Sequence, residues 1–119
     1  MALPHDHGHN GDYMAAHIPQ EDMFAEVASV FRQLSDGNRL RLFFILCHTE
    51  ECVINLSAMM KMSSPAVAHH LKSLKTAELI VSRRDGKEVY YKAADTEKAR
   101  ALHDAMETMM EMTACPWDE

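Results

Sequence analysis

A helical pattern followed at once by a hairpin pattern, within residues 62–92, constrains the fold of this chain more than any other feature. Val67, Leu71 and Leu74 recur at spacings of four and three residues, so they form one apolar stripe that faces a core. The polar residues of the same segment stay outside that stripe. The pattern therefore predicts an amphipathic helix.

Small residues mark the start of this helix. Ser63 or Ser64 can accept a hydrogen bond from the free N–H groups of the first turn, and Pro65 suits the first helical position because its missing N–H has no partner there. Such a turn lets the backbone approach a groove of DNA, which recognition helices read mainly through their N-terminal residues. An ordinary amphipathic helix with a polar outer face is the alternative. The predicted DNA contacts of this helix are Ser63, Ser64, Pro65, Ala66, His69, His70, Lys72 and Lys75.

Residues 80–92 have the pattern of a β-hairpin. Apolar and polar residues roughly alternate there, and Asp85-Gly86 supplies a tight turn with positive φ. Cations near the tip of a hairpin can reach phosphates without sitting in a core. A basic hairpin alone is commonly a solvated edge, but directly after a helix of this kind it predicts the wing of a winged helix-turn-helix. The predicted wing contacts are Arg83, Arg84 and Lys87.

The distribution of charge supports a DNA-binding surface even though the total charge does not. The chain has a formal net charge of -6, which by itself argues against a nucleic-acid partner. Residues 61–92, however, hold seven Lys and Arg against three Asp and Glu, so this segment carries +4 and the rest of the chain -10. We therefore expect binding that is oriented and steeply dependent on salt.

The length of 119 residues and a hydrophobic content of 47% suit one domain with a modest core. We expect a His-rich, mobile tail over residues 1–19, a winged-helix and dimerisation domain over residues 20–114, and a C-terminal tail over residues 115–119. A membrane-length apolar run and a secretory signal are both missing, so a cytoplasmic location is expected. Neither a nucleophile–base set nor a phosphate loop appears, and we do not expect an enzyme.

Apolar residues at helical spacing predict four further helices. They cover residues 21–34, a segment that starts after Ser35-Asp36-Gly37, residues 55–61 and residues 95–113. In the third of these, Leu56, Met59 and Met60 are expected to turn inward. The predicted fold class is mainly α, a winged helix-turn-helix with about five helices and a two-stranded wing.

The last predicted helix carries more apolar side chains than so small a domain needs. An exposed apolar face would be covered by a second copy, so we expect a two-fold homodimer through the terminal helices. Such symmetry also matches half-sites about 34 Å apart on the duplex. The alternative is that the helix folds back onto its own domain. The expected interface side chains are Val27, Phe31, Leu102, Met106, Met109 and Met110.

Four separated segments, in the right order and spacing, carry a resemblance to a known family: residues 34–42, 51–56, 64–71 and 84–91. Over roughly residues 23–113 the chain resembles the ArsR/SmtB family of metal-sensing repressors. The resemblance implies a homodimer that occupies an operator and leaves it when a metal or another thiophilic signal binds. The family's DNA contacts fall on Ser64, Pro65, Ala66, His69, His70, Arg83, Arg84 and Lys87. Ala68 is a departure, since members often carry serine there.

The resemblance also implies two metal sites, and the chain departs from both. Members that hold zinc between paired terminal helices use two carboxylates and two imidazoles. The corresponding positions here are Asp95, Glu97, Thr108 and Glu111, which lack the imidazoles. Members that sense soft ions use a Cys-Val-Cys pair, where this chain has Cys52-Val53-Ile54.

Other thiols and imidazoles remain as candidate ligands, and these suit zinc and its neighbours. Cys47 and Cys52 would point about 140° apart on an unbroken helix, so a shared ion requires the helix to end near His48. We expect a thiol-containing site that includes Cys52. His103 with Glu107, one turn apart, is a further possible site or a surface pair. The candidate ligands are Cys47, His48, Cys52, Cys115, His5, His7 and His9.

The pattern as a whole predicts a DNA-binding transcriptional repressor released from its operator by zinc or a similar thiophilic ion, without an organic cofactor. The expected partners are operator DNA, a second copy and the metal ion, with no membrane. Three cysteines, an odd number in a reducing compartment, also fit a repressor that responds to thiol oxidation or reactive sulfur. A metal-buffering or interaction protein with a vestigial DNA surface is the alternative from another class.

Overall fold

The computed structural model describes residues 2–112, which fall into two units that divide between Phe31 and Arg32. The sequence instead places its boundary after residue 19. The first unit holds α1 (Gly11–His17) and most of α2 (Glu21–Gln33), and neither helix has a buried residue. α1 was not predicted, because its residues form no apolar stripe. Within it the ring of Tyr13 stacks on that of His17, with ring centroids 3.9 Å apart.

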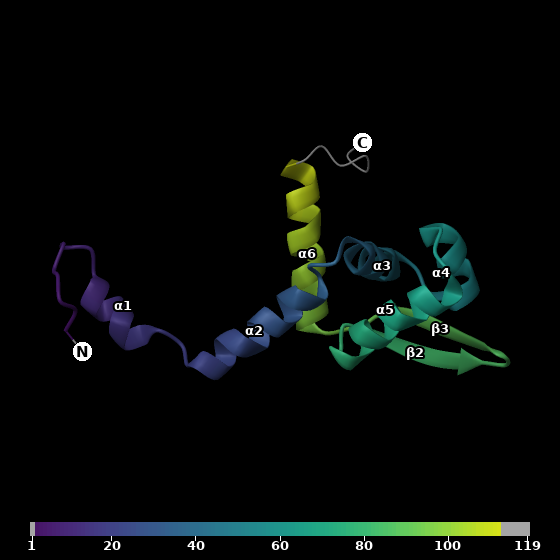
Figure 1. Cartoon of the computed structure of the whole chain (residues 1–119), viewed down its shortest axis with the longest axis horizontal. Coiled ribbons are helices and arrows are strands. Elements are labelled where there is room, and N and C mark those ends of the chain that lie inside the picture. Colours follow the sequence, from purple (N-terminus) through teal and green to yellow (C-terminus); the bar gives the residue numbers. More distant parts are fainter. Residues whose placement is uncertain (1, 113–119) are drawn as a thin grey trace. The chain divides into compact units, whose positions relative to one another are not determined.

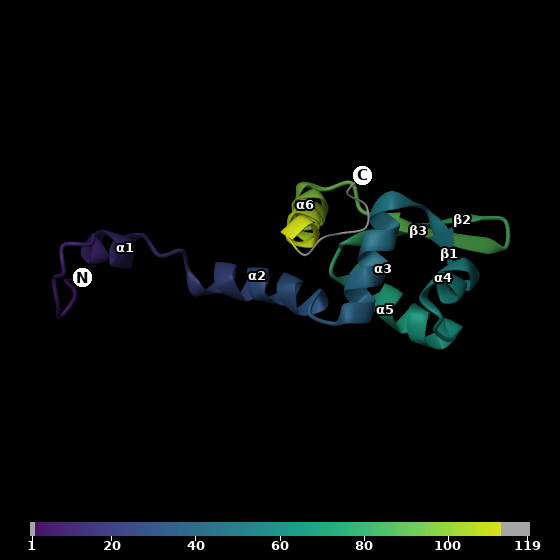
Figure 2. The same ribbon diagram turned by 90° about the horizontal axis from the view of Figure 1, so that it is seen from above.

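The second unit is a winged helix-turn-helix, which confirms the predicted fold class. Figures 1 and 2 show α3 between α6 on one side and the α4–α5 pair on the other, while the β2–β3 hairpin points away from α6. The described residues contain six helices and a third short strand, slightly more than predicted. The elements of this unit are α3 (Gly37–His48), β1 (Glu51–Cys52), α4 (Val53–Met60), α5 (Ser64–Thr76), β2 (Ile80–Asp85), β3 (Glu88–Ala93) and α6 (Glu97–Met112).

The three strands form an antiparallel sheet in the order β1-β3-β2. Asp85 pairs with Glu88 across a two-residue turn, and Gly86 begins that turn with a φ of 64°. A positive φ is inexpensive only for glycine, which explains the choice of residue. Glu51 and Cys52 of β1 pair with Tyr91 and Tyr90 of β3, so the chain that follows α3 is fixed to the wing.

The core lies where α3, α4, α5 and the base of the hairpin meet. The apolar stripe predicted for α5 is buried, as expected. Ala99 and Met106 of α6 are buried in the same cluster. None of the helices within residues 2–112 is long and apolar enough to cross a membrane. The largest fully buried side chains are Phe43, Leu42, Leu46, Leu56, Leu71, Leu74, Leu79, Ile80 and Val67.

Two expectations about apolar side chains need correction. Met59 was expected in the core but is 44% exposed, because Leu56 and Met60, four residues apart, already occupy the inward stripe of α4. Met106 was expected at a dimer interface but is only 7% exposed and packs in its own domain. Part of the apolar stripe of α6 thus packs against the core of its own domain, while Met109 on the same helix is 67% exposed.

Asp36 caps α3 by accepting a hydrogen bond from the backbone N–H of Arg39 at 3.0 Å. This bond lowers the pKa of the Asp36 carboxyl below its ordinary value. Its contribution to stability is therefore present above the unfolded pKa, about 3.9, and is lost as the pH falls through the folded pKa.

We expect Asp36→Asn to be less stable than the wild type at neutral pH and to converge with it in acid. Asparagine keeps an acceptor at the cap but has no charge that depends on pH in this range. Urea unfolding between about pH 7 and 2 measures the difference, with Glu26→Gln at an exposed position of α2 as the control. A difference that stays constant over this range would contradict the role of the Asp36 charge.

Candidate nucleic-acid interface and metal-ligand cluster

The start of α5 is fixed to α4 by serine hydroxyls. Ser63 is the N-cap, and its Oγ accepts from the backbone N–H of Ala66 at 3.3 Å. Ser57 of α4 donates its hydroxyl to the carbonyl of Met62 at 2.7 Å and lies 3.2 Å from the Oγ of Ser64. These contacts set the angle at which the first turn of α5 leaves the core. No sequence pattern marked Ser57 as a functional residue.

The predicted contact residues of α5 differ in their exposure. Ala66 is half-buried within the first turn, and Pro65 occupies its second position rather than its first. His70 is also half-buried, and its Nδ1 is a buried atom without a hydrogen-bond partner among the described residues. The exposed members of the predicted set are Ser63, Ser64, Pro65, His69, Lys72 and Lys75.

Arg83 is held by the body of the protein rather than free at the tip of the wing. It pairs with Tyr90 in the middle of the hairpin, and its guanidinium lies 5.0 Å from the centre of that ring. Its Nε and Nη2 donate to the two carboxylate oxygens of Glu50 at 3.0 and 2.7 Å. The hydrogen bond from Arg83 lowers the pKa of the Glu50 carboxyl. A phosphate group would therefore have to displace Glu50 in order to bind the Arg83 side chain.

Arg84 faces the other side of the sheet, because successive strand residues alternate between faces. Ser82 shares that side and accepts a hydrogen bond from Lys75 of α5 at 2.7 Å, so this side is the one next to the recognition helix. Arg84 and Lys87 are exposed, and neither has an ion pair within residues 2–112. The cations of this surface, which we call the reading surface, are Lys72, Lys75, Arg84 and Lys87.

Among the described residues, neither Cys47 nor Cys52 joins His48 in a group of three or more possible metal ligands. Cys47 is half-buried, and burial, with a smaller effect from the Glu107 charge, raises the pKa of its thiol to about 11. Cys52 is buried in β1. His5, His7 and His9 belong to the first unit, where the rings of His5 and His7 stack with centroids 5.7 Å apart. Cys115 lies outside the described residues.

The terminal-helix positions implied by the resemblance are exposed. Asp95 forms an ion pair with Arg100, and Thr108 donates its hydroxyl to the carbonyl of Asp104 at 2.9 Å. Glu97 and Glu111 lie near opposite ends of α6. Within one protomer these side chains do not form a ligand group of three or more among the described residues.

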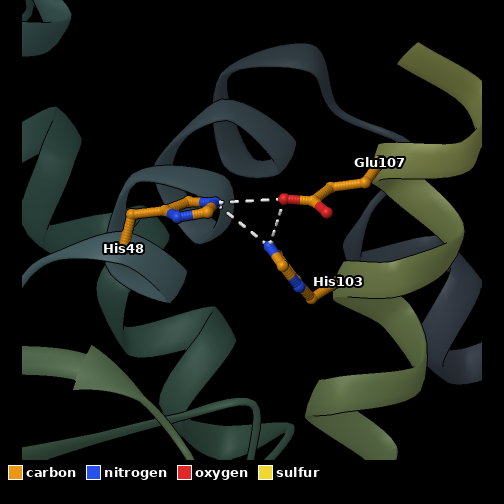
Figure 3. Close-up of side chains that lie close together, drawn as sticks. All are labelled: His48, His103 and Glu107. Carbon is orange, nitrogen blue, oxygen red and sulfur yellow. Dashed lines mark hydrogen bonds and ion pairs between the residues drawn. The ribbon is translucent and has the colours of Figure 1, made fainter. Parts of the chain in front are cut away.

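One group of possible metal ligands does converge in the described part of the chain: His48 from the end of α3 with His103 and Glu107 from α6 (Figure 3). The Nε2 atoms of the two histidines are 3.0 Å apart. The Oε1 atom of Glu107 is 3.0 Å from Nε2 of His103 and 3.6 Å from Nε2 of His48. The sequence indicated His48 as one candidate ligand and His103 with Glu107 as a separate pair. It did not predict that they lie together, because the two histidines are 55 residues apart.

Comparisons with known proteins agree with this architecture. The family described as "Bacterial regulatory protein, arsR family" matches residues 36–82. The "Transcriptional repressor SmtB homolog" of Synechocystis sp. is 37% identical over 90 residues, which cover 76% of this chain and 68% of that protein. The "Cadmium resistance transcriptional regulatory protein CadC" of Listeria innocua is 41% identical over 66 residues, which cover 55% of this chain and 56% of that protein.

Solved structures share the fold. The NMR structure of a homodimeric winged helix-turn-helix DNA-binding domain from Mycobacterium bovis, described as a possible ArsR-family transcriptional regulator, has a TM-score of 0.67 at 25% identity. That comparison covers 93% of this chain and 91% of the other. HlyU from Vibrio cholerae has a TM-score of 0.70 at 21% identity, with 76% and 97% of the two chains covered.

Proposed function

The chain belongs to the arsR family of bacterial regulatory proteins, and on that premise we propose that it is a transcriptional repressor that a transition metal ion releases from its operator. The family is one of transcriptional regulators rather than enzymes. The repressor would act in the cytoplasm, where the chromosome of a bacterium lies. Its partners would be duplex DNA, a second copy of the chain and the metal ion.

The observation that carries the proposal is the reading surface beside the first turn of α5. The first turn presents small, exposed residues, which suits entry into the major groove. The hydrogen bond between Lys75 and Ser82 joins the helix to the wing, so Arg84 and Lys87 would approach the phosphates that flank the groove. Phosphate contacts of this kind orient a protein on the duplex, whereas base contacts from residues such as His69 would supply sequence preference.

A homodimer would complete the DNA-binding form. The M. bovis relative is described as homodimeric. In this chain Phe31 of α2 is 62% exposed, Val27 is also exposed, and Met109 of α6 presents a further apolar side chain. An apolar helix face of this kind suits burial against a second copy. We therefore assign the interface to α2 and the exposed part of the α6 stripe, without Met106.

Metal release is the form of regulation that the chain supports best. The Listeria relative is named for cadmium resistance, and α3 and α6 of this chain bring two imidazoles and a carboxylate together. The thiol-redox alternative has less support, because a Cys47 thiol with a pKa of about 11 is protonated at neutral pH and therefore a weak nucleophile. Buried Cys52 is shielded from an oxidant in solution.

The proposal is tested with the reduced full-length protein and a DNA fragment from upstream of its own coding sequence. Fluorescence anisotropy should show a salt-dependent complex without metal and its dissociation on stoichiometric addition of zinc, nickel, cadmium or copper(I). Failure to bind at low salt would favour the metal-buffering protein. Release by peroxide or persulfide, with none from any of the ions, would favour the redox repressor.

A further inference from the structure

We propose that His48, His103 and Glu107 of one protomer form the metal site through which this repressor is released, and that the site takes zinc or a similar borderline divalent ion. The inference rests on the proposed function and names its sensor. The sequence predicted a sensor site that contains cysteine. The site proposed here instead consists of imidazole and carboxylate ligands between α3 and α6 (Figure 3).

The three ligand atoms have the spacing of one face of a tetrahedral site. Zinc with bonds of about 2.0–2.1 Å to nitrogen and oxygen has neighbouring ligand atoms about 3.3 Å apart. The corresponding separations here are 3.0, 3.0 and 3.6 Å. The side chains could therefore bind the ion with shifts of a few tenths of an ångström, which exposed or half-buried side chains can make.

Protons cannot satisfy the three contacts at once while the carboxylate is ionised. Each Nε2 either carries a hydrogen or presents a lone pair. With a hydrogen on both nitrogens, the two N–H groups lie 3.0 and 3.6 Å from the Glu107 carboxylate but also face each other at 3.0 Å. With a hydrogen on only one nitrogen, the other nitrogen presents its lone pair to the carboxylate. A cation among the three atoms accepts all three lone pairs, so the arrangement suits a metal better than it suits hydrogen bonds.

The surroundings orient both imidazoles. The ring of Phe44 lies 4.7 Å from that of His48 and 6.3 Å from that of His103, between centroids, and so limits the rotation of both. Nδ1 of His103 lies 3.5 Å from Oδ1 of Asp104. Histidine ligands in metal sites commonly direct their second nitrogen at a carboxylate, which fixes the tautomer and strengthens the ligand.

The ligand set also indicates which ion the site takes. Two imidazoles and one carboxylate suit zinc and its neighbours in the first transition row, whereas soft ions prefer thiolates. Sites with three protein ligands keep a fourth position open. A cavity of about 690 Å³ has His48 and Glu107 in its lining, so water can reach that position.

An ion at this site would connect α6 to the segment that carries the wing. His48 ends α3, and Glu50, two residues later, holds Arg83 of the hairpin. β1 follows at once and pairs with β3. Joining His48 to α6 would therefore restrain the position of the wing relative to α6, which gives the ion a physical path to the reading surface.

Metal binding is measured on the reduced, full-length chain with His5, His7 and His9 replaced by alanine, so that the tail does not contribute ligands. Titration with cobalt(II) should show one ion per protomer with the visible bands of tetrahedral nitrogen and oxygen ligation, without a thiolate charge-transfer band. Zinc displaces cobalt, and this competition gives the zinc affinity. The same samples are tested for release of the promoter fragment.

His103→Ala and Glu107→Gln should each lower zinc affinity at least about a hundredfold, since loss of a residue that only hydrogen-bonds to a metal ligand already costs ten- to a hundredfold. His17→Ala and Cys52→Ser should leave it unchanged, and circular dichroism confirms that each variant folds. Unchanged affinity in both cluster variants, or a thiolate band that Cys52→Ser abolishes, would overturn the site. If zinc still releases the DNA from the His103→Ala variant, the cluster is not the sensor, although the protein can still be a metal-released repressor. If zinc binds at the cluster without releasing DNA, the cluster has no signalling role.

Discussion

Replacing Arg84 and Lys87 together by alanine is expected to lower the affinity of the proposed dimer for its operator several hundredfold at 0.15 M salt. Both side chains are exposed on the reading surface. Each contact between a cation and a phosphate releases about 0.9 counterion, so the loss of one contact lowers the affinity for DNA about fivefold at this salt concentration. Because each protomer of the dimer would make two such contacts, the double variant loses four phosphate contacts in all. The slope of log affinity against log salt should become shallower by about 3.6.

The matched control for this pair lies in the same hairpin. Arg83→Ala combined with Glu50→Gln removes an ion pair whose two charges already neutralise each other. We expect the salt slope of this double variant to match that of the wild type, because Arg83 is engaged by Glu50 rather than by phosphate. Anisotropy titrations at several salt concentrations compare the two variants. An equal loss of slope in both would show that Arg83 leaves Glu50 on the duplex and that the assignment of faces is wrong.

Leu71→Ala is expected to lower the free energy of unfolding by about 2 to 5 kcal/mol, the range for deleting a buried leucine side chain. Leu71 is 1% exposed and belongs to the central stripe by which α5 packs on the core. A loss of this size is a large fraction of the 5–15 kcal/mol that typically stabilises a domain. The variant should therefore also bind DNA more weakly, because the recognition helix is no longer held firmly.

Ile54→Ala removes a similar volume from an exposed position of α4 and serves as the control. Its effect should stay within about 0.5 kcal/mol, as for most surface substitutions. Urea unfolding followed by circular dichroism measures both variants, with the midpoint compared at equal slope. Similar losses in the two would mean that α5 does not pack through Leu71 in solution.

Much of the reading surface could be predicted because its signals are local. A stripe at helical spacing, a serine cap and a glycine turn each depend on residues within a few positions of one another, and all three occur in the structure. Local patterns did not predict α1, because that helix has no apolar stripe. They also predicted, wrongly, that Met59 faces the core. Nor did they distinguish Arg83 from Arg84. Their difference comes from Glu50, which lies 33 residues before Arg83.

The candidate metal site shows the limit of this approach most clearly. His103 and Glu107 are one turn apart, and their pairing is visible in the sequence as a local spacing. His48 was visible only as a neighbour of two cysteines. Burial of Ala99 and Met106 holds α6 against the core, and in this position its polar edge meets the end of α3. Hydrophobic packing of α6 therefore explains why the imidazole of His48 lies beside His103 and Glu107.

Local patterns along the chain are enough to predict a winged helix with basic residues on its last core helix and hairpin, because helices, turns and apolar stripes follow from short-range sterics and periodicity. Two outcomes follow only from the packed fold: which cation of the wing lacks an ion pair among the described residues, and which side chains converge on one point. Those outcomes depend on how helices and strands from distant parts of the chain pack together, and no local pattern records that.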